Sequence, residues 1–349
     1  MNKLFKKIIA LTIPTLLISS LISCGDSSKS KDESSKSSSS LTAIDAYGEL
    51  DPQVSAQQII ADKMGYFEEE GLKVTNHLMT GPDQNASLVA NGTAGICFGS
   101  VYNNIAVAAN GMKVKVLAPL ANAGGTQSVV ARPGLTLNSA KDLEGKKIGV
   151  TSGAGVLIAV RNMCDELNVD IDKINFINLQ ASDQLASLEK GDIDAMACWE
   201  PWVGKALDAG GTLLFSGTTS NLPEKKGDVH WIDFYMTVQV TDDFFNKHPD
   251  EVKKFLKALV KATDYINSNT EDAAKIIAKE INIDENECLR IMKNNVYSME
   301  FNNQFIEGSN TMAKFMKEMD SIKEVPDFSD YGYSDTLKEI NSSLVTITE

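Results

Sequence analysis

Residues 147–167, KIGVTSGAGVLIAVRNMCDEL, hold an apolar strand, a loop of small residues and an apolar helix in direct succession. The strand is predicted over 147–150, the loop over 151–155 and the helix over 155–167. The alternation continues with strands predicted at 129–131, 175–179, 194–199 and 212–215 and helices at 182–190 and 200–209. Strands that alternate with helices are typical of an α/β fold, in which helices cover both faces of a mainly parallel sheet.

The residues before this stretch show the same alternation. Strands are predicted over 41–46, 72–79, 94–98 and 114–120, and helices over 53–64, 82–90 and 101–110. After a long strand predicted at 231–240, the pattern changes to helices near 252–266, 270–280, 285–294, 309–319 and 334–343. The sequence therefore predicts two α/β units and a helical C-terminal region.

The first 40 residues predict export and a membrane anchor. Three lysines in residues 1–7 precede an apolar run over 8–22, which is shorter than the roughly 20 residues that span a membrane. The run ends in Leu21-Ile22-Ser23-Cys24, which resembles a bacterial lipobox. We expect residues 1–23 to be a lipoprotein signal peptide and Cys24 to receive lipid; the alternative is a stray cysteine in an ordinary signal. Residues 24–40 would be a serine-rich linker that holds the body at the outer face of the cytoplasmic membrane.

Charge and composition exclude several classes of function. The net charge of −14 argues against nucleic acid or an anionic membrane surface as a partner. The cysteines beyond Cys24 form no C-x-x-C pair, and the three histidines are isolated, so we expect no metal site, no cofactor and no catalytic triad. The spacings of Cys97, Cys164, Cys198 and Cys288 predict no particular disulfide.

Four loops at strand ends are candidates for ligand binding, because ligands of open α/β sheets lie beyond the carboxyl ends of the strands. They are residues 47–53, Gly99-Ser100, residues 151–155, and Trp199-Glu200-Pro201-Trp202. In 151–155 the small residues leave backbone N–H groups accessible at a helix start, which favours an anion. A plain helix cap explains the same residues. A dinucleotide fingerprint does not, because Ile158 stands where its third glycine belongs.

The fourth loop also has two interpretations. Glu200 and Pro201 suit the start of a helix, and both tryptophans could simply pack in the interior. Alternatively, Trp199 lies at the carboxyl end of a strand, where its ring could stack on a ligand and the Glu200 carboxylate could hold an amine.

Three stretches carry a resemblance to a known family. They are DKMGYFEEEGLKV at 62–74, KDLEGKKIGV at 141–150 and GDIDAMACWEPW at 191–202. With these motifs in this order, residues 42–265 resemble the periplasmic binding proteins of ABC importers for sulfonates, nitrate, taurine and related small molecules.

The resemblance implies a type II periplasmic-binding-protein fold. Two lobes would be joined by crossings near 123–127 and 235–240, with residues 41–125 and 238–349 in lobe 1 and 126–237 in lobe 2. Ligand would close the cleft between them. The site residues it implies are Tyr47, Gln53, Ser100, Thr126, Ser152, Gly153, Ala154, Gly155, Trp199, Glu200 and, more weakly, Tyr235.

The function that the resemblance implies is capture of a small organic anion, sulfonate-like, taurine-like or nitrate-like, by a monomer that delivers it to a permease with its ATPase. Residues 153–155 lack a second hydroxyl or a basic side chain, which weakens the case for a strong anion. The alternative ligand is an aminated heterocycle such as a thiamine precursor. A pyrimidine precursor synthase on the same fold is the alternative of a different class, but the chain lacks the cysteine motif of such enzymes.

Overall fold

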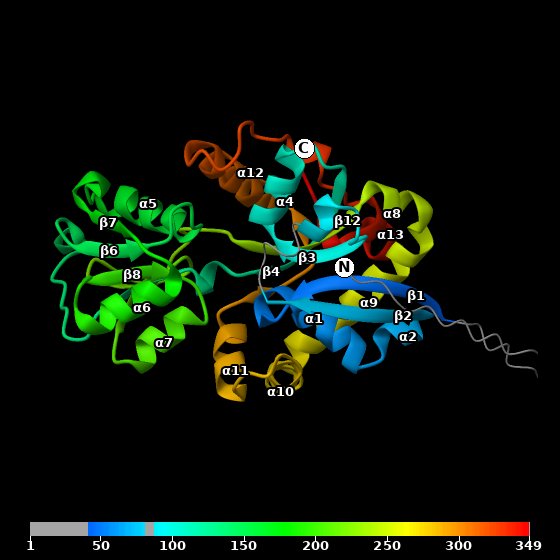
Figure 1. Cartoon of the computed structure of the whole chain (residues 1–349), viewed down its shortest axis with the longest axis horizontal. Helices are drawn as coiled ribbons and strands as arrows, with labels where there is room; N and C mark the ends of the chain where they lie inside the picture. The colour runs from blue at the N-terminus through cyan, green and yellow to red at the C-terminus, as the bar shows by residue number, and fades with distance from the viewer. Residues whose placement is uncertain (1–40, 81–86, 349) are drawn as a thin grey trace, which may run out of the picture. The chain divides into compact units, whose positions relative to one another are not determined.

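The computed structural model describes residues 41–80 and 87–348, so the expected signal peptide, Cys24 and the linker lie outside the described residues. The described residues form one compact unit. Within it are two main sheets, each covered by helices, which we call the first and second lobes (Figure 1). The two-lobed α/β fold predicted from the sequence is confirmed.

The first sheet has the strand order β13-β4-β12-β3-β1-β2. Its strands are β1 (Thr42–Glu49), β2 (Leu72–Met79), β3 (Ile96–Ser100), β4 (Val114–Asn122), β12 (Tyr235–Thr241) and β13 (Val296–Tyr297). On one side lie α4 (Val101–Ala109) and α12 (Asn303–Glu318); on the other lie α1 (Pro52–Lys63) and α9 (Pro249–Ser268) (Figure 1). Further helices of this lobe are α2 (Tyr66–Glu69), α8 (Asp242–Lys247), α10 (Thr270–Ile281), α11 (Glu285–Lys293) and α13 (Asp335–Ile340). Strands β14 (Phe301–Asn302) and β15 (Val345–Thr346) form a separate pair.

The second sheet has the order β11-β10-β9-β5-β8-β6-β7. Its strands are β5 (Ser128–Ala131), β6 (Lys147–Val150), β7 (Asn175–Asn178), β8 (Ala195–Cys198), β9 (Thr212–Ser216), β10 (Thr219–Leu222) and β11 (Lys225–Asp228). Helix α5 (Val156–Leu167) covers one face, and α6 (Ala181–Lys190) and α7 (Trp202–Asp208) cover the other (Figure 1).

The expectation of mainly parallel sheets is wrong, because both sheets are mixed. Strands β1, β2 and β3 are mutually parallel, as are β6, β7 and β8, but the remaining pairings are antiparallel. The reason is the chain path: β5 and β12 each enter their sheet directly after the chain crosses between lobes, and both run against their neighbours. The hairpin β10–β11 was not predicted, and the expected strand at 231–240 begins only at Tyr235.

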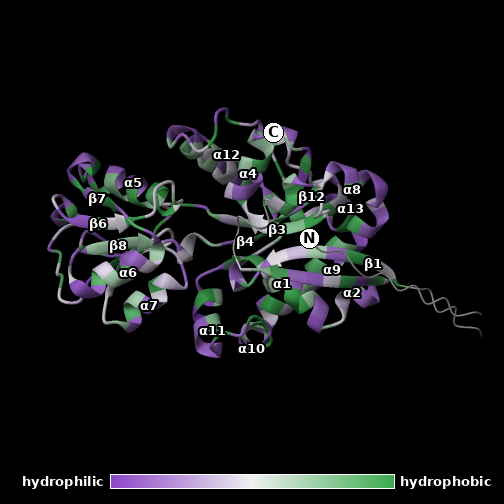
Figure 2. Cartoon of the chain, viewed as in Figure 1, coloured by the Kyte–Doolittle hydropathy of each residue, from purple (hydrophilic) through white to green (hydrophobic). Residues whose placement is uncertain are grey.

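Amphipathic helices explain the packing of the first lobe. Helix α9 buries Val252, Phe255, Leu256 and Leu259 at helical spacing, and its other face is charged. Phe255 stacks on Phe67 with 4.8 Å between ring centroids. Figure 2 shows hydrophobic residues on β12 and hydrophilic ones on the outer faces of helices such as α8. None of the described helices is long and apolar enough to cross a bilayer.

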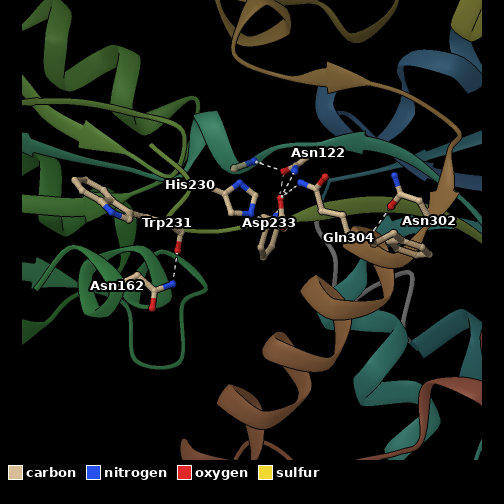
Figure 3. Close-up of polar contacts among 10 residues, drawn as sticks. Asn122, Asn162, His230, Trp231, Asp233, Asn302 and Gln304 are labelled. Carbon is tan, nitrogen blue, oxygen red and sulfur yellow. Dashed lines mark hydrogen bonds and ion pairs between the residues drawn. The ribbon is translucent and has the colours of Figure 1, made fainter. Parts of the chain in front are cut away.

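The chain passes between the sheets twice, between Asn122 and Ser128 and between Asp228 and Tyr235. The two segments are held together by side chains (Figure 3). Asn122 Nδ2 donates to Asp233 Oδ1 at 2.6 Å, and Asn122 Oδ1 accepts from the Phe234 N–H at 3.2 Å. Gln304 Nε2 of α12 also donates to Asp233 Oδ1, at 3.1 Å, and His230 Nε2 lies 3.0 Å from Asp233 Oδ2. β12 begins two residues before the predicted lobe boundary at 237.

Candidate functional site

A pocket of about 460 Å³ lies where the loops at the carboxyl ends of the parallel strands meet. These strands are β1, β2 and β3 of the first sheet and β6 and β8 of the second. The pocket is lined by Glu49, Leu50, Asp51, Gln53, Val54, Thr80, Ser100, Tyr102, Asn103, Gln127, Thr151, Ser152, Gly153, Ala154, Gly155, Trp199, Glu200, Pro201, Phe234 and Met236. Both lobes therefore contribute to one site, which is the arrangement expected of a ligand between lobes.

The structure brings most of the predicted site residues together. Gln53, Ser100, Ser152, Gly153, Ala154, Gly155, Trp199 and Glu200 all line the pocket.

Tyr47, Thr126 and Tyr235 do not line it. Tyr47 stacks on His77 at 4.6 Å between ring centroids, and Tyr235 packs its ring edge against Phe305. The buried Thr126 hydroxyl lies 2.6 Å from Gln53 Oε1, so Thr126 supports a lining residue without reaching the pocket.

The loop 151–155 presents backbone rather than side chains. Gly153 has φ +77°, a left-handed conformation that favours glycine. A Cβ on Gly155 would lie 2.8 Å from Cε2 of Phe234, so only glycine fits there without a shift. The Ser152 N–H donates to Asn178 Oδ1 at 3.0 Å, and the Ala154 N–H to the Thr151 carbonyl at 3.0 Å. No partner for the Gly153 or Gly155 N–H occurs in the described part of the chain.

The loop after β8 contains a buried acid. Glu200 is 1% exposed, and its Oε2 accepts from the Gly204 N–H at 2.9 Å, which caps the start of α7. Burial raises the pKa of Glu200 above its ordinary value, while the Gly204 N–H and the charge of Arg290 oppose that rise. Pro201, after a cis peptide bond, is the residue before α7, so the expected helix start at 200 lies two residues too early. Trp199 is half-buried beside it.

On the first-lobe side, Asp51 caps helix α1. Its Oδ1 accepts from the Gln53 N–H at 2.8 Å, and Gln53 Nε2 lies 3.2 and 3.1 Å from the two carboxylate oxygens. Burial raises the pKa of Asp51 to about 6. Because Gln53 Oε1 faces the Thr126 hydroxyl, Thr126, Gln53 and Asp51 form one connected chain of polar contacts.

The pocket is acidic. Glu49, Asp51 and Glu200 line it, and none of the described lining residues is Lys, Arg or His. The aromatic side chains of Tyr102, Trp199 and Phe234 supply apolar walls. A ligand bearing an amine or other cationic group meets complementary charge here, whereas an anion meets only uncharged donors: backbone N–H groups, hydroxyls and side-chain amides such as that of Asn103.

Several lining residues were not singled out from the sequence. Tyr102 and Asn103 occupy the first turn of α4, directly after Ser100, and their place beside a strand end could have indicated them. Asp51 carried a signal too, as an acid just before the helix-starting Pro52. Gln127 and Phe234 come from the crossings and Met236 from the start of β12, and the position of these segments depends on the three-dimensional path.

No group of three or more His, Cys, Asp or Glu side chains suited to a metal ion occurs in residues 41–80 and 87–348. Cys97, Cys164, Cys198 and Cys288 are free and buried. Burial raises the pKa of each of these thiols to about 12, so they remain protonated at neutral pH.

The family model described as NMT1/THI5 like matches residues 53–273, which include most of both lobes. The chain belongs to the NMT1/THI5-like family. It is 25% identical over 244 residues to a Bacillus subtilis (strain 168) protein named for binding aliphatic sulfonates, covering 68% of this chain and 70% of that one. It is also 25% identical over 270 residues to the taurine-binding periplasmic protein of Escherichia coli (strain K12), covering 71% and 80%.

A solved structure supports the same fold. The periplasmic aliphatic sulphonate binding protein SsuA from Escherichia coli matches with a TM-score of 0.68 at 15% identity, covering 82% of this chain and 96% of that one. These two relatives are named for binding aliphatic sulfonates and taurine, and the Escherichia coli protein is named as periplasmic.

Proposed function

We propose that this protein is the solute-binding component of an ABC importer and that its ligand is a small organic anion that also carries an amine, as taurine does. The observation that carries the proposal is the pocket itself, in which a loop of accessible N–H groups and three carboxylates face one space between the lobes. The sulfonate would lie at Gly153–Gly155, and the amine near Glu200.

Two features favour this ligand over nitrate or a plain alkylsulfonate. The pocket has no basic side chain among its described residues, so a simple anion gains no ion pair there. Such a ligand offers no positive charge to the carboxylates of the lining, whereas an ammonium group on the ligand could form an ion pair with one of them.

An aminated heterocycle, such as a thiamine precursor, is the second candidate. The aromatic side chains of Tyr102, Trp199 and Phe234 favour it, because they could stack on a ring, and the volume of about 460 Å³ exceeds what taurine needs.

We further propose that the protein returns its ligand unchanged and passes it to a membrane permease powered by an ATPase. The buried thiols, which have no thiolate character, support a binding role over nucleophilic chemistry on this fold. We also propose that the protein is a monomer, that it binds no nucleic acid, and that lipid on Cys24 anchors it to the membrane. Detergent partitioning of the wild type and Cys24→Ala tests the anchor, because both would partition alike if Cys24 carried no lipid.

The binding role is tested with a ligand panel on the purified protein. Taurine, ethanesulfonate, nitrate and an aminopyrimidine are compared by thermal shift and solution scattering. A cognate ligand at about 100 times its dissociation constant stabilises the folded state by roughly 2.7 kcal/mol. It should also make the scattering profile more compact, and mass spectrometry should recover it intact. Chemical conversion of the ligand would contradict the binding role.

A further inference from the structure

Arg290 connects the two lobes next to the pocket without lining it. It belongs to α11, which packs against α10 and α1 of the first lobe. Its guanidinium lies against α7 of the second lobe, with Nη1 3.4 and 3.5 Å from the Asp208 carboxylate oxygens. The Arg290 Nε is buried and has no hydrogen-bond partner among the described residues.

The guanidinium lies directly over Gly204. A Cβ at Gly204 would come within 2.0 Å of Nη2, 2.5 Å of Cζ and 2.9 Å of Nε, so the planar group occupies the space that any other residue would fill. Gly204 is also the residue whose N–H donates to Glu200 Oε2. Contacts therefore connect Arg290 of the first lobe, through Gly204 of the second lobe, to Glu200 at the pocket.

The charges around Glu200 come from both lobes. Glu200 is 1% exposed, and Arg290 is the cation that acts on it, while Glu287 of α11 and Asp208 of α7 act in the opposite direction. The Cys198 thiol lies nearby and is protonated. Without Arg290, burial and two acids would oppose the ionised form of Glu200, with only the Gly204 N–H favouring it.

We propose that Arg290 is a positioning residue. Its guanidinium lies on Gly204 and holds the start of α7, and with it the Glu200 carboxylate that the Gly204 N–H binds, in place at the pocket. Recognition of a ligand amine by the second lobe therefore depends on a side chain of the first. The effect of Arg290 on ligand binding rests on the proposed function, but the effect of Arg290 on Glu200 can be measured without a ligand. Arginine suits this role because a flat guanidinium fits over a glycine, whereas a lysine would supply only a point charge.

The first experiment follows Glu200 in the ligand-free protein. Carboxyl-labelled glutamate is titrated by NMR, and Glu200→Gln identifies the resonance. In Arg290→Gln the titration midpoint of Glu200 should rise by about 1 pH unit, and Arg290→Lys should restore part of that change. Lys293→Gln is the matched control, because it removes one positive charge from the exposed face of the same helix. An unchanged midpoint in Arg290→Gln would overturn the proposal.

The second experiment measures binding, with taurine as the probe, between pH 5 and 8. Arg290→Gln should weaken binding about tenfold at pH 7 and move the acid limb of the pH profile upward, with partial rescue by Arg290→Lys. Gly204→Ala should act like Arg290→Gln, because its Cβ displaces the guanidinium. Equal affinity and an equal pH profile in the wild type and Arg290→Gln would refute the role of Arg290 in binding. Failure of the wild type to bind taurine would instead contradict the proposed ligand, and the NMR result would still decide the inference about Glu200.

Discussion

The loop at 151–155 and the loop at 199–201 follow adjacent parallel strands, β6 and β8, and line the same pocket, yet they offer opposite chemistry. The first presents glycines and backbone N–H groups, and the second presents a tryptophan and a buried carboxylate. Asp51 and Glu49 of the first lobe add to the acidic side. The difference indicates a ligand with two poles, because neither loop alone accounts for the whole lining.

The largest expected loss of affinity comes from removing the charge of Glu200. Glu200→Gln should weaken taurine binding by about 1.5–3 kcal/mol, or roughly 10- to 150-fold, since it removes a charge-assisted hydrogen bond. Ethanesulfonate, which has no amine, should bind equally or more tightly. Calorimetric titration of both ligands checks this. Unchanged affinities for both ligands would show that Glu200 acts only at the start of the helix.

The ionised Asp51 carboxylate in the pocket lining should lower the free energy of unfolding at neutral pH. Its pKa of about 6 lies above its ordinary value of 3.8, so the folded protein binds this proton more tightly than the unfolded chain does. The stabilisation is complete below pH 3.8 and is lost as the pH rises through 6.

Asp51→Asn should therefore raise the free energy of unfolding at pH 7 by about 1–2 kcal/mol, because asparagine still caps α1 but avoids the buried charge. The gain is limited because Asp51 is only half-buried and because asparagine keeps only one of the two oxygens that accept from Gln53 Nε2. The gain should vanish below pH 4. Denaturant melts at pH 4 and 7 measure it, and a variant that is less stable at both pH values would contradict the account.

A substitution in the loop at 151–155 should weaken binding of ligands with and without an amine alike. A Cβ in Gly155→Ala meets the Phe234 ring and shifts the backbone donors, so taurine and ethanesulfonate should both lose about three- to tenfold in affinity. Selective loss of taurine alone would place the amine, rather than the sulfonate, at this loop.

The smallest effect is expected at Ser152. It is exposed, and its N–H is held by Asn178, so Ser152→Ala should change either affinity by less than about twofold. The same titrations measure it, and a tenfold loss would mean that the hydroxyl contacts the ligand directly.

The sequence predicted those parts that depend on local pattern. The strand at 147–150, the small-residue loop and the helix after it are as expected, and eight of the eleven predicted site residues line the pocket. The antiparallel directions of β5 and β12 were missed, because strand direction depends on where the chain crosses between lobes. The family resemblance placed Tyr47 and Tyr235 in the site, but neither lines the pocket, and their rings pack against His77 and Phe305. The acidic character of the lining also required the structure, since Glu200 is far in sequence from Glu49 and Asp51.

The most direct test of a two-pole ligand is the ratio of the taurine and ethanesulfonate dissociation constants, measured by calorimetry at pH 7. The two molecules differ only in the amine, so their ratio isolates the contribution of the carboxylates. We predict that taurine binds about 10- to 100-fold more tightly, the scale of one charge-assisted hydrogen bond. Ethanesulfonate binding as tightly as taurine, or more tightly, would contradict the account.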